Sequence, residues 1–243
     1  MTAASLAFDG PRRHYAVTDS TNDRARELLE AGAPSGTIVT AGEQSAGRGR
    51  HGRRWSAPPG AALLCSFILR PLDLSHSLLP LAVPLAVCDA AESLAPVECM
   101  VKWPNDIWLE ERKLAGVLIE ARPPEWAVIG IGLNLAIGDD DFPADLRWPA
   151  TSLGHGVGAD QALAALRTVL GRWVEAPAAE VVAEFERRDA LRGREVSWEA
   201  TAGAAGGGAG RAAGIDERGN LVVAVEGGER VALGSGEVQL RLG

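Results

Sequence analysis

The sequence predicts an α+β fold in which a mixed β-sheet domain with flanking helices is followed by a small domain of β-strands. Helix-like and strand-like segments are interspersed up to Arg192. The segment from 101 to 135 is rich in strand-forming residues. After Arg192, short strand-like segments alternate with glycine-rich turns, as in a small β-barrel or sandwich of about 50 residues. We therefore expect one domain over residues 1–191 and a second over 192–243.

The N-terminal third predicts two strands, a helix and a third strand that is buried. The helix begins near Ser20, which together with Asp23 resembles a capping box, and Gly32 is expected just after its last residue. Residues 42–60 are rich in Gly, Pro and Arg and predict a long loop. The expected strands are 12–17, 37–41 and 61–69, and the last of them is apolar enough to be buried.

The rest of the chain predicts three more helices, a β-rich centre and the small β-domain. Pro80 and Pro84 limit the early turns of the helix expected at 76–94. Glu110 to Arg112 is expected to connect two strands as a hairpin, and the Gly/Ala-rich segment 201–210 to form a flexible hairpin tip. The expected strands are 101–103, 107–109, 113–120, 126–135, 194–199, 211–215, 221–226, 230–233 and 237–241, and the remaining helices are 160–175 and 177–190.

The charge is uneven along the chain. The net charge of −8 argues against a dedicated nucleic-acid binder, because phosphate neutralisation needs a basic face. Residues 1–70, however, carry nine Arg and six acidic residues, whereas 71–243 carry 15 basic and 26 acidic residues. A local basic site on an acidic body suits a small anionic ligand. Only two of the 24 basic residues are lysines, Lys102 and Lys113.

Cysteine usage and hydropathy predict a cytoplasmic protein. The three cysteines have no short-spaced pair, which is typical of reduced thiols. The N-terminus lacks the pattern of a signal peptide. The longest apolar-rich stretch, 78–87, contains two prolines and is too short to span a membrane. The ordinary globular composition excludes collagen-like, disordered and disulfide-scaffold proteins.

The segment QSAGRGRHGRRW, from Gln44 to Trp55, predicts an anion site beside an aromatic residue. Its glycines let backbone N–H groups approach a ligand closely, and its arginines offer guanidinium forks for phosphate or carboxylate. Trp55 adds a flat face on which a base can stack. A disordered RNA-binding tract is the alternative, but the segment is not repeated and the chain is acidic.

Both lysines fall in the next candidate segment, which reads KWPND from Lys102 to Asp106 and continues with KLAG from Lys113 to Gly116. An ammonium group suits a point contact with a carboxylate or phosphate oxygen. Asn105 has the donor and the acceptor that an adenine edge requires, and Asp106 is suited to hold Mg²⁺, act as a base or orient an amine. A solvated turn is the alternative for this Pro-Asn-Asp sequence.

Two further segments are candidates for the same pocket. Gly130 and Gly132 lie within an expected strand, where glycine suggests close approach of a ligand or backbone, and Asn134 follows them. The hydroxyls and N–H groups of Ser20, Thr21 and Asn22 at a helix start can bind a polar ligand head, although a plain helix cap explains them equally well. The four histidines show no metal-binding spacing, and Walker A and GxSxG motifs are absent.

These segments, taken in this order, resemble the biotin protein ligase family. The resemblance runs from Asp19 to Asn22, through the Gly-Arg loop, and on through the KWPND, KLAG, Gly130–Asn134 and 150–153 segments. It covers the expected catalytic domain, whereas the tail after Arg192 is similar to the family's SH3-like domain only in length and strand texture. The resemblance implies a class II synthetase-like catalytic domain of the biotin/lipoate ligase type and a small SH3-like β-barrel.

The family's reaction, as implied by the resemblance, has two steps. ATP and biotin give biotinyl-5′-AMP and pyrophosphate, and biotin is then transferred to a lysine of a biotin carboxyl carrier protein or domain of acetyl-CoA or a related carboxylase. ATP with Mg²⁺ and biotin would be the ligands, with no metal cluster bound by the protein and no residue assigned to Mg²⁺. Since a carboxylate attacks a phosphate, the site must neutralise two anions.

The resemblance also implies roles for individual residues. The implied catalytic residues are Lys113, Arg48, Arg50 and Asp106. The implied biotin contacts are Ser20, Thr21, Asn22, Gln44, Gly47, Arg48, Gly49, Arg50, Lys113 and Gly116. The implied ATP and adenine contacts are Arg48, Arg50, Trp55, Lys102, Asn105, Lys113 and Asn134.

Two alternative functions and several properties of the partners stay open at this point. A lipoate or octanoate ligase of the same fold is the nearest alternative, and a non-enzymatic RNA-binding module using the Arg-Gly loop is the more distant one. Only 18 residues precede Asp19, too few for the winged-helix DNA-binding domain that some members carry, so we expect no DNA partner. We also expect no membrane association, and a monomer or weak homodimer.

Overall fold

The larger of two β-sheets is mixed, as the sequence predicts. The computed structural model describes residues 8–144, 146–154, 156–200, 206–234 and 238–242. Seven of the described strands form this sheet in the order β1-β2-β3-β7-β6-β5-β4. β1 pairs in parallel with β2, and all other neighbours are antiparallel. The strands are β1 (Arg12–Thr18), β2 (Ile38–Gln44), β3 (Ala62–Leu69), β4 (Met100–Lys102), β5 (Asp106–Leu109), β6 (Arg112–Arg122) and β7 (Trp126–Asn134).

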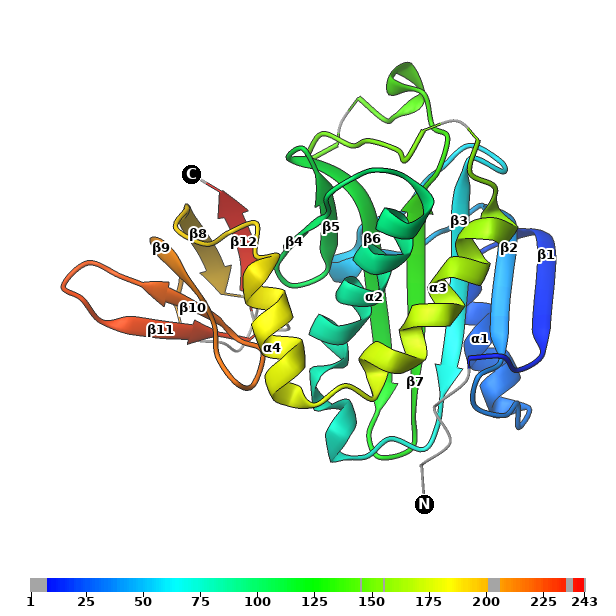
Figure 1. Cartoon of the computed structure of the whole chain (residues 1–243), viewed down its shortest axis with the longest axis horizontal. Helices are drawn as coiled ribbons and strands as arrows, with labels where there is room; N and C mark the ends of the chain where they lie inside the picture. The colour runs from blue at the N-terminus through cyan, green and yellow to red at the C-terminus, as the bar shows by residue number, and fades with distance from the viewer. Residues whose placement is uncertain (1–7, 145, 155, 201–205, 235–237, 243) are drawn as a thin grey trace.

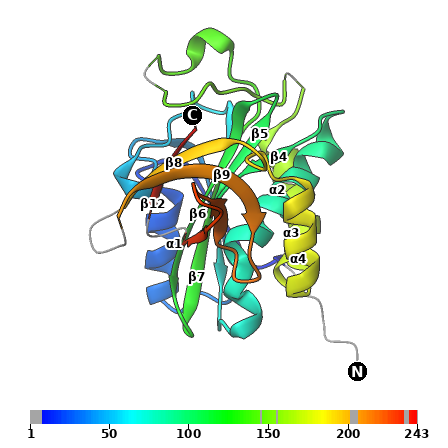
Figure 2. The ribbon, with the colours of Figure 1, turned by 90° about the vertical axis from the view of Figure 1, so that its left-hand side faces the viewer.

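Helices cover both faces of this sheet (Figures 1 and 2). α1 (Thr21–Glu30) connects β1 to β2 and packs on one face, while α2 (Leu79–Leu94) and α3 (Ala159–Val174) pack on the other, with α4 (Ala178–Arg187) against α2. Because strand side chains alternate, Cys65 and Phe67 of β3 join the main core. Ser66 instead points to the α1 face and contacts that helix. The α1 face therefore carries a polar contact at Ser66 beside a small apolar cluster in which Ala25 and Leu29 pack on Val39, Ile68 and Val128.

The α2 segment is the most apolar helix of the protein and is a core helix. Together with the 3-10 turn η2 (Leu74–Leu78), it forms 21 helical residues that are long and apolar enough to cross a membrane. Because 67% of its most apolar window is buried inside the protein, this is weak evidence for a membrane span. Pro80 lies in the first turn of α2, where its missing N–H costs nothing, so the α-helix begins at Leu79 and not at 76.

The second sheet is antiparallel and consistent with an SH3-like domain (Figure 2). Its strand order is β11-β10-β9-β8-β12. β9 begins at Gly208, earlier than expected, because a Cβ there would lie 2.5 Å from the Trp198 ring and only glycine fits this pairing. Residues 201–205 of the expected hairpin tip lie outside the described residues, and the domain boundary at 191/192 stays a prediction. The strands are β8 (Glu195–Ala200), β9 (Gly208–Ile215), β10 (Leu221–Ala224), β11 (Arg230–Leu233) and β12 (Val238–Leu242).

Three local predictions are corrected by the structure. The capping box is wrong: Ser20 is the N-cap residue of α1, but its side chain makes no cap bond. Its backbone N–H donates to Asp19 Oδ1 at 2.7 Å, and Asp23 pairs with arginines instead. The loop after β2 starts later than expected, since β2 continues to Gln44 alongside β1. The β5–β6 turn consists of Glu110 and Glu111 alone, both left-handed as a two-residue hairpin requires. Gly32, with φ of +88°, follows the last residues of α1 as expected.

Candidate active site

Two glycines of β7 form the floor of the candidate site. A Cβ at Gly130 would lie 2.2 Å from Asn22 Oδ1, and a Cβ at Gly132 would lie 2.4 Å from the Trp55 ring. Any larger residue would push these side chains off the sheet. The glycines therefore permit a close approach, as expected, but what approaches is Asn22 and Trp55 of the same chain.

A buried polar cluster lies at the start of α1. Ser20, Thr21 and Asn22 are each less than 5% exposed. The backbone N–H of Thr21 donates to Gln44 Oε1 at 2.7 Å, and its hydroxyl donates to the same oxygen at 3.1 Å. Ser66 Oγ lies 2.8 Å from Thr21 Oγ1 and 2.7 Å from Asn22 Oδ1. The structure thus brings together four of the residues that the sequence analysis expected at the biotin end.

Lys113 lies at the edge of the glycine floor. Its Nζ is 2.6 Å from Asp106 Oδ1 and 5.5 Å from the centroid of the Trp55 ring. A Cβ at Gly116 would lie 3.3 Å from this nitrogen and 3.1 Å from the indole, so glycine leaves room for both. An ammonium held by a carboxylate and an aromatic face is fixed in place and stays available to an anionic ligand.

Arg50 reaches the same region from the Gly-Arg loop. Its Nη1 donates to Asn105 Oδ1 at 3.3 Å, while Asn105 Nδ2 donates to Val117 O at 2.8 Å. Burial lowers the pKa of Arg50, and the nearby Asp106 acts in the opposite direction. An arginine remains charged under these conditions. Asn105 therefore fixes the β4–β5 turn to β6 and holds Arg50 beside it.

Lys102 lies in a buried aromatic box on the other side of Asp106. It is 5% exposed, and its Nζ is 5.2 Å from the ring centroid of Trp148 and 5.9 Å from that of Trp108. Burial lowers the pKa of Lys102 to about 8, and Asp106 partly counteracts this shift. Both lysines of the chain thus flank one carboxylate.

Asn134 anchors the segment that passes over Lys113. Its Nδ2 donates to Thr151 O at 2.9 Å. The backbone of Lys113 is bonded to the same segment, since its N–H donates to Pro149 O at 2.7 Å and its carbonyl accepts from Thr151 N at 2.9 Å. Asn134 therefore lies beside the site, where its side chain holds the backbone at Thr151.

Arg48 contacts acidic residues of two other elements. Its guanidinium lies 2.8 Å from Asp23 Oδ1 on α1 and 3.1 Å from Glu120 Oε1 on β6. The neighbouring glycines shape the loop: Gly47 O accepts from Trp55 N, and Gly49 N donates to Arg53 O.

Three residues of this site were not predicted from the sequence. Ser66 lies in the strand that was predicted to be apolar and buried. Because a buried hydroxyl needs hydrogen-bond partners, this serine could have been recognised from the sequence as a candidate site residue. Glu120 and Trp148 carried no such signal, because only the pairing of β6 with β7 and the fold of 146–151 bring them to the site.

Metal ligands do not cluster in the described part of the chain. No group of three or more His, Cys, Asp or Glu side chains that could hold a metal ion lies among these residues. Asp106, the carboxylate suggested for Mg²⁺, is instead paired with Lys113. These residues provide no cage of their own for a metal ion.

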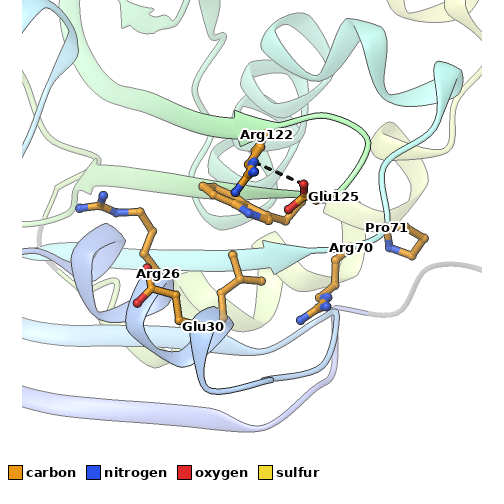
Figure 3. A pocket seen from close by; sticks show the side chains of 8 residues that line it. Arg26, Glu30, Arg70, Pro71, Arg122 and Glu125 are labelled. Atoms are coloured by element: carbon orange, nitrogen blue, oxygen red, sulfur yellow. Dashed lines mark ion pairs between the residues drawn. The ribbon is translucent and has the colours of Figure 1, made fainter.

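A separate pocket lies beyond the C-terminal half of α1 and is distinct from this cluster (Figure 3). It is lined by side chains of α1 and the β6–β7 turn, with Arg122 and Glu125 forming an ion pair at 3.3 Å. None of the residues expected at the ligand site lines it. The lining residues are Arg26, Leu29, Glu30, Arg70, Pro71, Arg122, Glu125 and Trp126.

Comparison with known proteins places this site in a family. Residues 15–134 match the Biotin/lipoate A/B protein ligase family, and residues 206–241 match the Biotin protein ligase C terminal domain. The chain is 34% identical over 238 residues to the biotin--[acetyl-CoA-carboxylase] ligase of Mycobacterium tuberculosis, covering 92% of this chain and 86% of that protein. The chain belongs to the biotin protein ligase family.

Other members of the ligase family match in part or in structure. The bifunctional ligase/repressor BirA of Bacillus spizizenii is 40% identical over 149 residues, covering 58% of this chain, and the chain spans about half of that relative's length, 46%. The biotin protein ligase of Aquifex aeolicus, solved in complex with biotin and ATP, superposes with a TM-score of 0.82 and 28% identity, covering 96% of this chain and 99% of that one.

Proposed function

We propose that this chain activates biotin with ATP and transfers it to a lysine of a biotin carboxyl carrier protein or domain. In the first step a biotin carboxylate oxygen bonds to the α-phosphorus of ATP, and the bond from that phosphorus to pyrophosphate breaks. In the second step the acceptor lysine nitrogen attacks the activated carbonyl carbon, AMP leaves with the bonding electrons, and the amine loses a proton. An amide between biotin and the carrier results.

The juxtaposition of Lys113 with the buried α1 cluster is the observation on which this proposal rests. One end of the site offers hydroxyl, amide and N–H groups at Ser20, Thr21 and Gln44, which suit the polar ring of biotin. The other end offers the Lys113 ammonium. Between them lies the glycine floor under Trp55. A ligand with a polar ring, a short apolar chain and a carboxylate matches this sequence of groups.

In this proposal Lys113 and Arg50 neutralise the biotin carboxylate and the phosphates of ATP. Both cations converge on the β4–β5 turn, Lys113 through Asp106 and Arg50 through Asn105. Fixed cations favour the charge that develops as the carboxylate meets the phosphate. Asp106 acts as a positioning residue that aims the ammonium. Arg48 is left out of the anion-binding set, because two carboxylates already neutralise its guanidinium.

The nucleotide end is assigned to the side of Asp106 that holds Lys102. Lys102 supplies a second ammonium, and Trp55 an aromatic surface. Asn105 and Asn134 shape this end through the backbone segments they hold. Mg²⁺ enters as part of the ATP substrate, since Mg²⁺ commonly binds through phosphates with few protein ligands. The buried, unpaired cysteines of the described residues support a reducing, cytoplasmic setting.

Labelled substrates test this function. The chain is incubated with ATP, a carrier domain and either labelled biotin or labelled lipoate, with a carrier whose acceptor lysine is replaced by arginine as control. Biotin label on the acceptor lysine, dependent on ATP, is the expected result. Label from lipoate alone would identify a lipoate ligase, and no label from either acid would contradict the proposal.

A further inference from the structure

The Gly-Arg loop is tied down by one side chain. Arg48 spans two elements, with Nη1 at 2.8 Å from Asp23 Oδ1 of α1 and Nη2 at 3.1 Å from Glu120 Oε1 of β6. Charge-assisted contacts of a guanidinium with carboxylates are stronger than neutral hydrogen bonds. Arg48 therefore connects the loop to the helix and to the sheet at once.

The two carboxylates are held in place by other contacts. Glu120 Oε2 accepts from Asn22 Nδ2 at 2.8 Å, and Asn22 is itself fixed on Gly130 and by Ser66. Asp23 also pairs with Arg26, one turn along α1. The Asp23 and Glu120 side chains are only 25% and 21% exposed, so water screens their contacts with Arg48 less than at an open surface. The two carboxylates that bind Arg48 are thus held in position by contacts that do not involve Arg48.

The contacts of Arg48 differ from those of its neighbour in the motif. Arg50 reaches the β4–β5 turn and Asn105, on the Lys113 side of the site. Arg48 turns instead toward α1, where Asp23 and Glu120 balance the charges of Arg48 and Arg26. Because its charge is neutralised, the Arg48 guanidinium attracts a phosphate only weakly. Its ion pairs instead hold the loop backbone around Arg48 against α1 and β6.

We propose that Arg48 is a tether that holds the loop from Gly47 to Trp55 over the buried α1 cluster, and that Asp23 and Glu120 are its positioning residues. This inference rests on the proposed function for its kinetic consequence. With the tether in place, the loop backbone stays beside Thr21 and Gln44, and the Trp55 ring stays on Gly132. Without the tether, biotin must order a looser loop when it binds. Biotin binding is then weaker, while Lys113 and Arg50 remain in place for the chemical step.

The matched variants are Asp23→Asn and Glu120→Gln, alone and combined. Each keeps the size of its side chain, and the glutamine oxygen can still accept from Asn22. The control is Asp160→Asn, which removes the carboxylate that pairs with Arg12 at 2.7 Å, at an exposed site on α3. The first readout uses the arginines of the loop: trypsin cleavage after Arg48, Arg50 and Arg53 is followed by mass spectrometry without any ligand.

The double variant is expected to be cut at these positions about tenfold faster than the unaltered chain, with Asp160→Asn unchanged. In biotin-dependent pyrophosphate exchange, its KM for biotin should rise about tenfold while kcat stays within about twofold. Arg48→Lys, which keeps the charge but cannot span both carboxylates, should show the same pattern more weakly.

Unchanged loop cleavage in the double variant would overturn the tether. So would an equal rise at the distant Arg167 and Arg172, because that pattern reports general destabilisation. Failure of the proposed function is distinguishable: the unaltered chain would then show no exchange with biotin, while the ligand-free cleavage assay would still report on the tether.

Discussion

Lys113 Nζ lies 2.6 Å from Asp106 Oδ1 because of an irregularity in the β5–β6 hairpin. Ile107 pairs with Ala115, but Trp108 pairs with Lys113, so Leu114 is an extra residue in β6. In a regular strand Lys113 would point to the same face as Ala115 and Val117, which belong to the main core. The bulge turns Lys113 to the face of Gly116 and Trp55, where it meets Asp106.

Removal of the Lys113 ammonium is expected to slow adenylate formation. Lys113→Ala should lower the rate of biotin-dependent pyrophosphate exchange by at least ~10²-fold, because a fixed cation at the developing charge is lost. Arg112→Ala is the matched control, since Arg112 is the adjacent residue and pairs with the exposed Asp139. Near-normal exchange in Lys113→Ala would remove Lys113 from the reaction.

Arg50 is expected to contribute on the same scale. Arg50→Ala should lower exchange by at least ~10²-fold, since the second cation at the β4–β5 turn disappears. Arg50→Lys keeps the charge but loses the guanidinium fork, so its exchange rate should lie between those of the unaltered chain and Arg50→Ala. Arg13→Ala, on the exposed strand β1, serves as control. If Arg50→Ala behaves like this control, Arg50 has only a structural place in the loop.

The floor of the site should not tolerate a methyl group. Gly132→Ala places a Cβ 2.4 Å from the Trp55 ring, so the indole must move. We expect a loss of about 1–3 kcal/mol in the free energy of unfolding and weaker biotin binding by calorimetry. Gly206→Ala, where a Cβ meets nothing within 4 Å, is the control. Unaltered biotin affinity in Gly132→Ala would show that the contact between Gly132 and Trp55 does not shape the biotin end of the site.

The charge on Lys102 predicts a pH dependence. Burial lowers the pKa of Lys102 to about 8, so its ammonium is present below that pH and is lost as the pH rises through it. If this ammonium attracts ATP, kcat/KM for ATP falls above pH 8. Lys102→Arg stays charged and should remove the fall, whereas Lys102→Met should be low at every pH. The same fall in Lys102→Arg would assign it to another group.

A buried arginine should dominate the stability of the helical layer. Arg188 has a side chain 5% exposed and lies within 3.0 Å of Asp89, Glu92 and Glu184, on α2 and α4. Arg188→Met leaves these carboxylates without their shared partner and should cost ~3–5 kcal/mol in urea unfolding. The adjacent Arg187 is 57% exposed, and among the described residues its ion pair is with Glu184, so Arg187→Met should cost at most ~1 kcal/mol. Equal losses would contradict this account.

Local sequence patterns predicted most elements but not the contacts between them. The segment around Ser20 predicted a helix start with polar groups, which the structure confirms. The order of strands places β7 between β3 and β6, and that pairing brings Gly130 under Asn22. Long-range pairing of this kind leaves no mark in any short segment.

The same limit applies to single side chains. The bulge at Leu114 decides where Lys113 points, yet KLAG reads as an ordinary strand start. The pairing of Arg48 with Asp23 and Glu120 joins residues 25 and 72 positions apart in the sequence, so the motif alone favoured an anion-binding role. The domain boundary and the roles of single site residues remain predictions.

The central claim is that this site joins biotin to the α-phosphate of ATP. Exchange of labelled pyrophosphate into ATP, with biotin or lipoate as the only added acid, measures this step directly and needs no carrier. We predict exchange that requires biotin, is not supported by lipoate and is lost in Lys113→Ala. Exchange with lipoate but not biotin, or no exchange with either acid, would contradict the account.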